Sequence, residues 1–216
     1  MKMEPYYSDD LVTIFNCDSR EILPMIEFDS LITDPVWPNA KANLYGKDDP
    51  FLMLKSILDL TNYNCKRIAI HLGCDSDPRF LNAVPERYKY FRSVSLEYVQ
   101  PCYKGRLLNG GDIAYLFGEV PPSKKGQMVI PGRYVDRDSN GKQTKHPCPR
   151  KLNHAKWLIK WWTSDQDIVC DPCSGSGTTL LAARILGRKS IGIEYEKSFC
   201  DMAIERFNQQ EMNLIT

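Results

Sequence analysis

The segment from Ile168 to Thr179 limits what this chain can fold into more than any other stretch. It reads IVCDPCSGSGTT, so a short apolar run ends in an acidic residue and is followed by a Gly-x-Gly turn. The next residues, Leu180 to Leu186, have helical character. A strand, a glycine turn and a helix in this order let the backbone approach a ligand where a side chain would collide with it. The pattern predicts a nucleotide-type cofactor site.

The residues around this turn also narrow the class of cofactor. No lysine follows the glycines, as a P-loop would require, so triphosphate chemistry is not expected. Leu180 stands where the dinucleotide fingerprint has its third glycine. Glu194 ends the next apolar run, at the distance where a carboxylate can reach a ribose diol. A cofactor with a ribose but no pyrophosphate fits this pattern, and S-adenosylmethionine is the candidate.

Apolar runs alternate with amphipathic runs along the chain, which predicts one α/β domain over residues 1–216 with a mostly parallel sheet. The strand candidates are almost continuously hydrophobic, as expected for strands buried on both faces, and they are Leu11–Phe15, Ser30–Thr33, Arg67–His71, Ile168–Cys170 and Ser190–Ile193. Helices are expected where apolar residues recur at helical spacing, over Phe51–Leu60, Leu152–Trp162, Thr178–Leu186 and Lys197–Asn208.

The middle of the chain has a different pattern. Longer β-rich runs from Tyr88 to Gly118, around Asn109-Gly110-Gly111, predict an antiparallel hairpin at the sheet edge. The segment 121–151 is interrupted by proline and glycine and has many more basic than acidic residues. It is either a solvated loop or an arm that contacts phosphates. Its basic residues include Lys124, Lys125, Arg133, Arg137 and Lys142.

The overall composition excludes several other classes of protein. A formal net charge of +1 over 216 residues excludes a general cationic coat for nucleic acid but allows a local basic face. The longest apolar stretches have strand length and the first residues do not form a signal peptide, so an intracellular, cytoplasmic protein is expected. Cys170-Asp-Pro-Cys173 has C-x-x-C spacing, but no second pair of ligands accompanies it, so neither a metal nor a redox site is expected.

A second candidate site follows the strand at 30–33. Asp34, Pro35 and Trp37 combine an acid, a rigid turn and a large aromatic ring at the carboxyl end of that strand. The simple explanation is a proline turn with a core tryptophan. The functional one is a pocket in which Asp34 accepts hydrogen bonds from an exocyclic amine while Trp37 stacks on its heterocycle. If this strand neighbours the one before Asp171, both acids open onto one crevice, because ligands bind where strand order reverses.

The two segments in this order resemble the DNA amino-methyltransferases that modify adenine N6 or cytosine N4, in the circularly permuted group often called beta. Asp34-Pro-Val-Trp37 is similar to the catalytic Asp-Pro-Pro-Tyr/Trp motif of that family, and 171–179 is similar to its cofactor loop. The segments 11–18, 145–150 and 191–199 resemble its adenine-binding strand, its His-Pro-Thr-x-Lys-Pro segment and its ribose-binding strand. Val36 replaces the second proline, and the segment at His146 lacks the usual Thr and Lys.

The resemblance implies a Rossmann-like fold and a site-specific enzyme that moves a methyl group from S-adenosylmethionine to the N6 amine of a flipped adenine in double-stranded DNA. Its expected catalytic residues are Asp34, Pro35 and Trp37. The residues expected to bind the cofactor are Asp18, His146, Asp171, Pro172, Cys173, Gly175, Gly177, Thr178, Glu194 and Tyr195. The family carries its target-recognition region at the place of residues 100–145, whose basic residues are then expected to contact DNA.

The resemblance leaves alternatives open. Cytosine N4 in DNA and adenine in RNA are alternative targets, and a non-catalytic DNA-binding module with the same fold is the alternative outside enzymes. A nicotinamide-dependent dehydrogenase would need a third glycine and would leave Asp34 unexplained. An acidic residue before the proline favours adenine within the family, and the permuted order favours DNA. A homodimer, a cognate restriction enzyme and the cytoplasm of a bacterium or phage-infected host are further expectations.

Overall fold

The computed structural model describes residues 4–39, 43–104, 107–121, 131–137 and 150–215. The strands, in the order in which they lie side by side, are β1 (Tyr7–Ser8), β2 (Val12–Phe15), β9 (Ser190–Ile193), β8 (Val169–Asp171), β3 (Ser30–Thr33), β4 (Arg67–Gly73), β6 (Leu107–Gly118), β5 (Tyr90–Lys104) and β7 (Arg133–Asp136). The helices are α1 (Ser19–Ile22), α2 (Pro50–Asp59), α3 (Leu152–Trp162), α4 (Thr178–Ile185) and α5 (Lys197–Ile215), with 3-10 turns at Leu23–Met25 and Pro78–Ala83.

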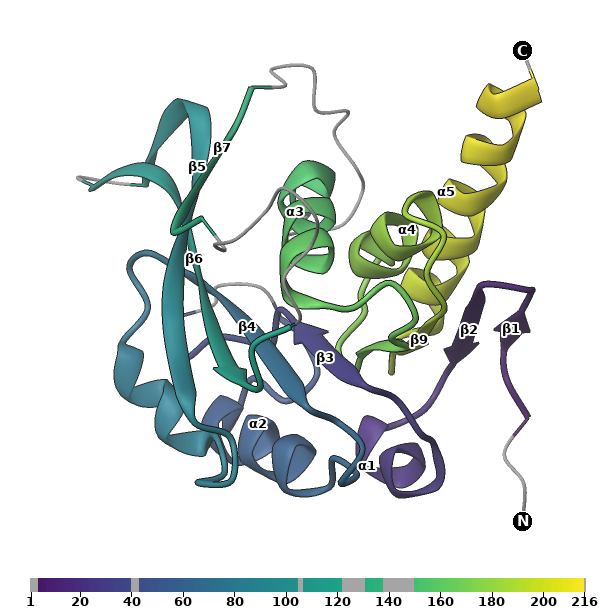
Figure 1. The fold of residues 1–216 in the computed structure, drawn as a ribbon, viewed down its shortest axis with the longest axis horizontal. Coiled ribbons are helices and arrows are strands. Elements are labelled where there is room, and N and C mark those ends of the chain that lie inside the picture. Colours follow the sequence, from purple (N-terminus) through teal and green to yellow (C-terminus); the bar gives the residue numbers. More distant parts are fainter. Residues whose placement is uncertain (1–3, 40–42, 105–106, 122–130, 138–149, 216) are drawn as a thin grey trace.

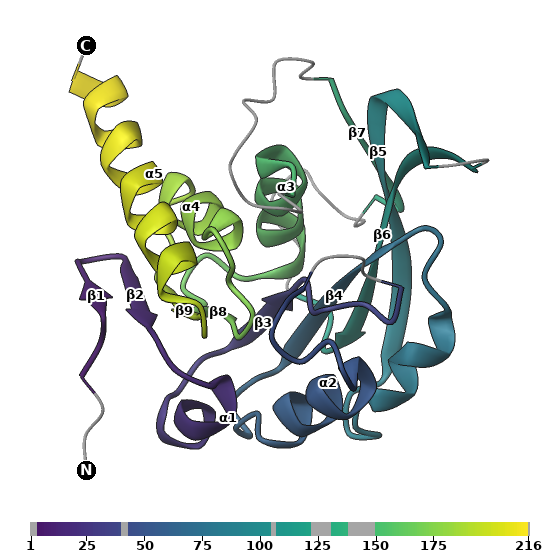
Figure 2. The same ribbon diagram turned by 180° about the vertical axis from the view of Figure 1, so that it is seen from behind.

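These elements form one mixed sheet between two layers of helices. Helices α3, α4 and α5 lie on one face of the sheet, and α1 and α2 lie on the other (Figures 1 and 2). The strands and helices predicted from the sequence are all present, with ends that differ by a residue or two, except that α5 continues to Ile215. Within the described ranges, none of the helices combines the length and the apolar character that crossing a membrane requires.

Strand β3 shows why the sheet is covered twice. Leu31 belongs to the core formed with α1 and α2, which also holds Leu54 and Ile57. The next residue, Ile32, belongs to the opposite core, which holds Trp162 of α3 and side chains of α4. Successive side chains of a strand point to opposite faces, so an uninterrupted apolar strand requires a packing layer on each side. The near-continuous hydrophobicity of these strands is therefore the cause of the three-layer arrangement.

The two strands that carry the candidate sites are neighbours. β3 and β8 pair in parallel, with Ser30 opposite Val169 and Leu31 opposite Cys170. From β8 the chain continues through α4 to β9 on one side, and from β3 it continues through α2 to β4 on the other side. Strand order therefore reverses between β3 and β8. This is the point at which open α/β sheets bind their ligands, beyond the carboxyl ends of the strands.

The predicted antiparallel hairpin is present, but the glycines that predicted its turn lie elsewhere. β5 and β6 pair up to Lys104 opposite Leu107, so Asn109-Gly110-Gly111 lies inside β6. A Cβ on Gly111 would stand 2.3 Å from the carbonyl oxygen of Leu96, next to an irregularity in the strand register. The glycine therefore permits a close approach of two strands at a bulge and does not form the turn.

The basic segment contributes a strand that its composition did not predict. β7 pairs in parallel with β5, with Arg133 opposite Ser95, and forms the sheet edge beyond the hairpin. The interpretation of this whole segment as a loop is therefore wrong at 133–136, and the hairpin is not the outermost part of the sheet. The predicted residues Lys124, Lys125, Lys142 and His146 lie outside the described residues.

Candidate active site

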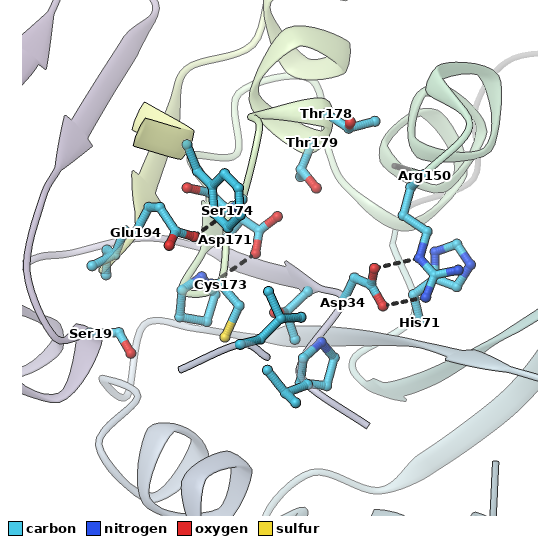
Figure 3. Close-up of a pocket in the computed structure, with 18 of the residues that line it drawn as sticks. Ser19, Asp34, His71, Arg150, Asp171, Cys173, Ser174, Thr178, Thr179 and Glu194 are labelled. Carbon is cyan, nitrogen blue, oxygen red and sulfur yellow. Dashed lines mark hydrogen bonds and ion pairs between the residues drawn. The ribbon is translucent and has the colours of Figure 1, made fainter. Parts of the chain in front are cut away.

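A cavity of ≈ 530 Å³ opens at the reversal point between β3 and β8 (Figure 3). Its volume is in the range of sites for cofactors and other small molecules. Many of the residues that line it come from the ends of β2, β3, β8 and β9 and the turns that follow them, and others come from α2, β4, α3 and α5. Among the residues predicted from the sequence, those in its lining are Asp18, Asp34, Pro35, Trp37, Asp171, Pro172, Cys173, Gly175, Thr178, Glu194 and Tyr195. The two candidate sites are thus parts of one cavity.

The two glycines after β8 have different tasks. Gly175 and Gly177 have φ values of 50° and 73°, a left-handed region that favours glycine. Gly175 lines the cavity, and its N–H donates to Glu194 Oε2 over 2.8 Å. Gly177 is not part of the lining; it is the N-cap of α4, and a Cβ on it would stand 2.6 Å from the Cβ of Ala203 in α5. Gly177 therefore lets α5 pack against the loop.

We expect Gly177→Ala to lower the free energy of unfolding by about 2–4 kcal/mol, because it combines left-handed strain with overpacking. Urea unfolding of the two proteins measures the loss. Gly187→Ala is the matched control, since Gly187 has φ 67° but no atom within 4 Å of its Cβ position. That variant should lose only the conformational part, about 1–2 kcal/mol. Equal losses in the two variants would contradict the packing role of Gly177.

Two carboxylates line the cavity, Asp171 at the end of β8 and Glu194 just after β9. Asp171 is 2% exposed, and burial raises its pKa to about 7. Its Oδ1 accepts the N–H of Cys173 over 3.1 Å (Figure 3). Burial also raises the pKa of Glu194, whose two oxygens accept the N–H groups of Gly175 and Glu196. In the described part of the chain neither acid forms an ion pair, so the cavity presents buried negative charge that a cationic ligand would stabilise.

Asp18 and Tyr195 lie at another part of the same cavity. The Asp18 carboxylate caps α1 by accepting the N–H of Arg20, and it also accepts the hydroxyl of Tyr45 over 2.8 Å. Hydrogen bonding from the Arg20 side chain lowers the pKa of Asp18 to about 2. The rings of Tyr45 and Tyr195 are stacked, with centroids 3.9 Å apart. Tyr45 and Arg20, which the sequence did not single out, thus hold the Asp18 carboxylate in place beside a flat aromatic surface.

Asp34, Pro35 and Trp37 form the opposite part of the cavity. Pro35 is buried, whereas Trp37 is only half-buried, and its Nε1–H donates to the carbonyl oxygen of His71 over 3.2 Å. The Asp34 side chain is 25% exposed, and its negative charge contributes to the raised pKa of Asp171. The two acids therefore face the same space. Trp37 packs against the core formed with α1 and α2 and also borders the cavity, so it is not a core residue alone.

Arg150 ends the segment 145–150 that resembles a family motif, but the sequence did not predict it as a site residue. Its Nη2 donates to Asp34 Oδ1 over 2.7 Å and its Nε donates to Asp34 Oδ2 (Figure 3). Its Nη1 donates to Asp112 Oδ2 over 2.9 Å. The guanidinium carbon lies 4.0 Å from the centroid of the Trp37 ring. Arg150 thus links the candidate catalytic turn to β6, which is far away in the sequence.

Arg206 of α5 is a second residue that the sequence did not reveal. Its Nη1 donates to the carbonyl oxygen of Ser176 over 2.5 Å and to the hydroxyl of Thr178 over 3.0 Å. Burial lowers the pKa of Arg206. These bonds fix the glycine loop and the first turn of α4 from the neighbouring helix, so Arg206 is a positioning residue for the loop.

Two of the residues predicted to contact DNA are described. Arg133 and Arg137 are exposed, at the start of β7 and just after its end. Arg133 Nη2 lies 2.7 Å from Glu97 Oε2 of β5. A partly neutralised cation at the edge of the sheet is available to a phosphate only in competition with this carboxylate.

Comparison with known proteins identifies the family of this chain. The sequence matches the DNA methylase family of N6 and N4 enzymes over residues 7–205. The chain belongs to this family. Curated relatives match over shorter stretches. The type II methyltransferase M.HindIII of Haemophilus influenzae is 41% identical over 68 residues, which are 32% of this chain and 22% of the relative. The orphan methyltransferase M.BamHII of Bacillus amyloliquefaciens is 47% identical over 64 residues, 29% and 23% of the two chains.

Solved structures share the fold of this chain over almost its whole length. The M1.HpyAVI–SAM complex has a TM-score of 0.72 at 24% identity, and the match covers 92% of this chain and 100% of that one. The PvuII DNA methyltransferase, which is cytosine-N4-specific, has a TM-score of 0.71 at 18% identity, with 94% and 88% coverage. The Rossmann-like α/β fold expected from the sequence is thereby confirmed. The stretches of M.HindIII and M.BamHII that match this chain span less than a quarter of each relative's length.

Proposed function

We propose that this DNA methylase transfers a methyl group from S-adenosylmethionine to the N6 amine of an adenine in double-stranded DNA, as a member of the permuted group. One observation carries the proposal. Asp34 follows β3, Asp171 is the last residue of the paired strand β8, and both line the same cavity. The first acid, with Trp37, offers an acceptor and a stacking surface for an amine-bearing ring. The second lies beside a glycine loop that can hold a methyl donor.

The residues of the cofactor side fit S-adenosylmethionine. Asp171 is a buried carboxylate without an ion pair among the described residues, so the ammonium of the methionine part would stabilise its charged form. Glu194 would bind the ribose hydroxyls, while the N–H groups of Gly175 and Glu196 orient its oxygens. Asp18 would accept the adenine amine beside Tyr195. When bound, the cofactor supplies an electrophilic methyl group on a sulfonium.

Asp34 and Pro35 would prepare the target nitrogen. An exocyclic amine is a poor nucleophile, because its lone pair is delocalised into the ring. If the Asp34 carboxylate and the Pro35 carbonyl each accept one N–H, the nitrogen becomes more tetrahedral and its lone pair is directed away from the ring plane. Asp34 or water then takes the surplus proton. No covalent bond to the enzyme is needed, so no cysteine has to act as a nucleophile.

The target base has to leave the DNA helix to reach this cavity. Unstacking a base costs a few kcal/mol, and stacking on an aromatic side chain offsets part of that cost. Trp37 is placed to do so, because its indole is anchored by a hydrogen bond to β4 and still borders the cavity.

Cytosine N4 is the second candidate target. The observation in its favour is the similarity to PvuII methyltransferase, a cytosine-N4-specific enzyme whose fold matches this chain with a TM-score of 0.71. Adenine and cytosine both present an exocyclic amine next to a ring nitrogen, so the Asp34 acceptor suits either base. Adenine is preferred because an acidic residue precedes the proline, which in the resembling family goes with N6 methylation.

Incubation of the purified protein with unmethylated genomic DNA and methyl-labelled S-adenosylmethionine tests the proposal. We expect label in N6-methyladenine after digestion of the DNA to nucleosides. Label in N4-methylcytosine would assign the second candidate, and label in RNA but not in DNA would overturn the choice of substrate. Sequencing of the methylated positions gives the recognition site from the same sample.

We expect charge reversal of Lys124, Lys125 and Arg133 to weaken DNA binding and flatten its salt dependence. Each lost phosphate contact reduces the slope of log K against log salt by about 0.9, so three lost contacts reduce it by about 2.7. Binding to a DNA duplex at several salt concentrations measures the slope. Lys55→Glu on α2 is the control, since Lys55 is exposed and paired with Asp59. An unchanged slope in the triple variant would mean that the basic segment does not contact phosphates.

A further inference from the structure

Arg150 makes, within one side chain, both of the interactions that the proposed function assigns to the target base. Its guanidinium donates two hydrogen bonds to the Asp34 carboxylate and lies over the Trp37 ring with 4.0 Å between its carbon and the ring centroid. We infer that Arg150 occupies the base site in the DNA-free protein and that, when the base enters, it leaves Asp34 and stays paired with Asp112. This inference rests on the proposed function, because it concerns the same pocket.

The chemistry of the two occupants is alike. A guanidinium is a planar group of N–H donors around one sp² carbon. Adenine and cytosine present a planar amine attached to a ring carbon that also bears a nitrogen. Both groups donate N–H bonds to a carboxylate and stack on an indole face. Arg150 therefore keeps the Asp34 carboxylate and the Trp37 face in the arrangement that an amine-bearing base requires.

The pocket does not accept both occupants at once. A stacked base needs the ring face that Arg150 covers, and it needs an oxygen of Asp34 to which Arg150 already donates. Trp37 cannot retreat, because β4 packs against it: a Cβ on Gly73 would stand 2.5 Å from Cζ3 of the indole. The Nε1–H bond to the carbonyl oxygen of His71 also fixes the ring. Entry of the base thus requires Arg150 to move.

Asp112 gives the displaced guanidinium a partner. It is 2% exposed and accepts Arg150 Nη1 over 2.9 Å, while it also accepts the Tyr98 hydroxyl and lies 3.4 Å from His71 Nε2. Although burial opposes it, His71 and Arg150 hold the pKa of Asp112 well below its usual range. Leaving a buried charge unpaired costs several kcal/mol. Because Asp112 remains ionised, Arg150 can leave Asp34 and keep a counter-ion.

The inference predicts that removal of Arg150 strengthens the binding of a base. If Arg150 fills the site nine-tenths of the time, the apparent affinity for a competing base is reduced about tenfold, and Arg150→Gln restores it. Deoxyadenosine and deoxycytidine are the probes, and ligand-observed NMR titration of the cofactor-free protein gives their dissociation constants. We expect about tenfold tighter binding of at least one nucleoside. Equal or weaker binding, including no binding to either protein, overturns the inference.

Three further variants make the test specific. Arg150→Lys keeps the charge but loses the planar fork, so it should bind nucleoside more tightly than the wild type, and it carries the test if Arg150→Gln does not fold. Asp112→Asn alone should weaken nucleoside binding relative to the wild type. The same substitution added to Arg150→Gln should have no effect on nucleoside binding. Arg184→Gln should change nothing, although Arg184 forms an ion pair with Asp9 at similar exposure and lies over Phe207.

Methyl transfer by the wild type separates this inference from the proposed function. Transfer of label to DNA together with an unchanged nucleoside affinity in Arg150→Gln would remove the role of Arg150 alone. Tighter nucleoside binding in the variant without transfer by the wild type would leave the pocket assigned but the proposed reaction wrong.

Discussion

Asp34→Asn should lower the rate of methyl transfer by about a hundredfold or more while leaving cofactor affinity nearly unchanged. The amide keeps the size of the side chain but removes the charge that accepts the N–H of the target amine, and a single positioned group of this kind contributes about 10²–10³ to a rate. Cofactor affinity should not fall, because loss of the Asp34 charge relieves the repulsion that helps to raise the pKa of Asp171. Single-turnover transfer and calorimetry measure the two quantities.

Asp9→Asn is the matched control for this variant. Asp9 is 25% exposed like Asp34, and it forms an ion pair with Arg184 as Asp34 does with Arg150. It lies outside the cavity lining, so its loss can reduce stability but not the chemical step at saturating substrate. Transfer by Asp34→Asn at the rate of Asp9→Asn would show that Asp34 acts only through folding.

The sequence predicted the parallel part of the fold because local pattern and final environment agree there. Strands such as β3 are buried on both faces, so every residue from Ser30 to Thr33 is apolar or small, and a short run of this kind is typical of a buried strand. The glycine loop was predictable for a similar reason. Gly175 and Gly177 adopt left-handed conformations that only glycine enters readily.

The hairpin and the edge strand show where local pattern fails. Asn-Gly is a strong turn signal, but this dipeptide lies inside β6, and the next residue, Gly111, packs against the β5 backbone beside a bulge. Strand β7 is four residues long, partly exposed and set among prolines and glycines, so it lacks the alternation that identifies a strand. Both outcomes depend on pairing partners that sequence spacing does not define.

Arg150 shows the same limit for the site. Its partners Asp34 and Asp112 are 116 and 38 residues away, and they meet only because β3, β4 and β6 are paired in one particular register. Arg206 lies on the same helix as the apolar residues that predicted α5, yet only the packing of α5 on the glycine loop gives it a role. Glycine and proline motifs identified the loops, whereas the charges that connect the loops required the structure.

Asp171 should make cofactor binding depend on pH. With a pKa of about 7, its carboxyl is half protonated at pH 7 in the cofactor-free protein, and an ammonium ligand binds the ionised form. Below pH 7 binding therefore has to release a proton, and affinity should be about fivefold weaker at pH 6 than at pH 7. Calorimetry at pH 6 in buffers of different ionisation enthalpy should detect close to one released proton. Equal affinities at the two values would contradict an Asp171–ammonium contact.

Asp171→Asn separates this carboxyl from Glu194, whose pKa burial also raises. The variant should bind the cofactor weakly and lose the part of the pH dependence that Asp171 causes. Although the variant should bind the cofactor more weakly, its cofactor-free form should be more stable than the wild type at pH 8. A pKa near 7 instead of 3.8 means that folding favours the protonated acid. The stability that the wild type gains from this preference is complete below pH 3.8 and is lost as the pH rises through 7.

At pH 8 the buried charge therefore costs the cofactor-free protein about 4 kcal/mol, at about 1.36 kcal/mol for each pH unit between the two pKa values. The neutral amide removes that cost, so Asp171→Asn should have the higher melting temperature at pH 8 without cofactor. At pH 4 the difference should nearly vanish. Saturating S-adenosylmethionine should reverse the order at pH 8, because only the wild type gains the ammonium contact. A variant that is less stable than the wild type under all these conditions would mean that Asp171 holds the loop together and does not serve the ligand.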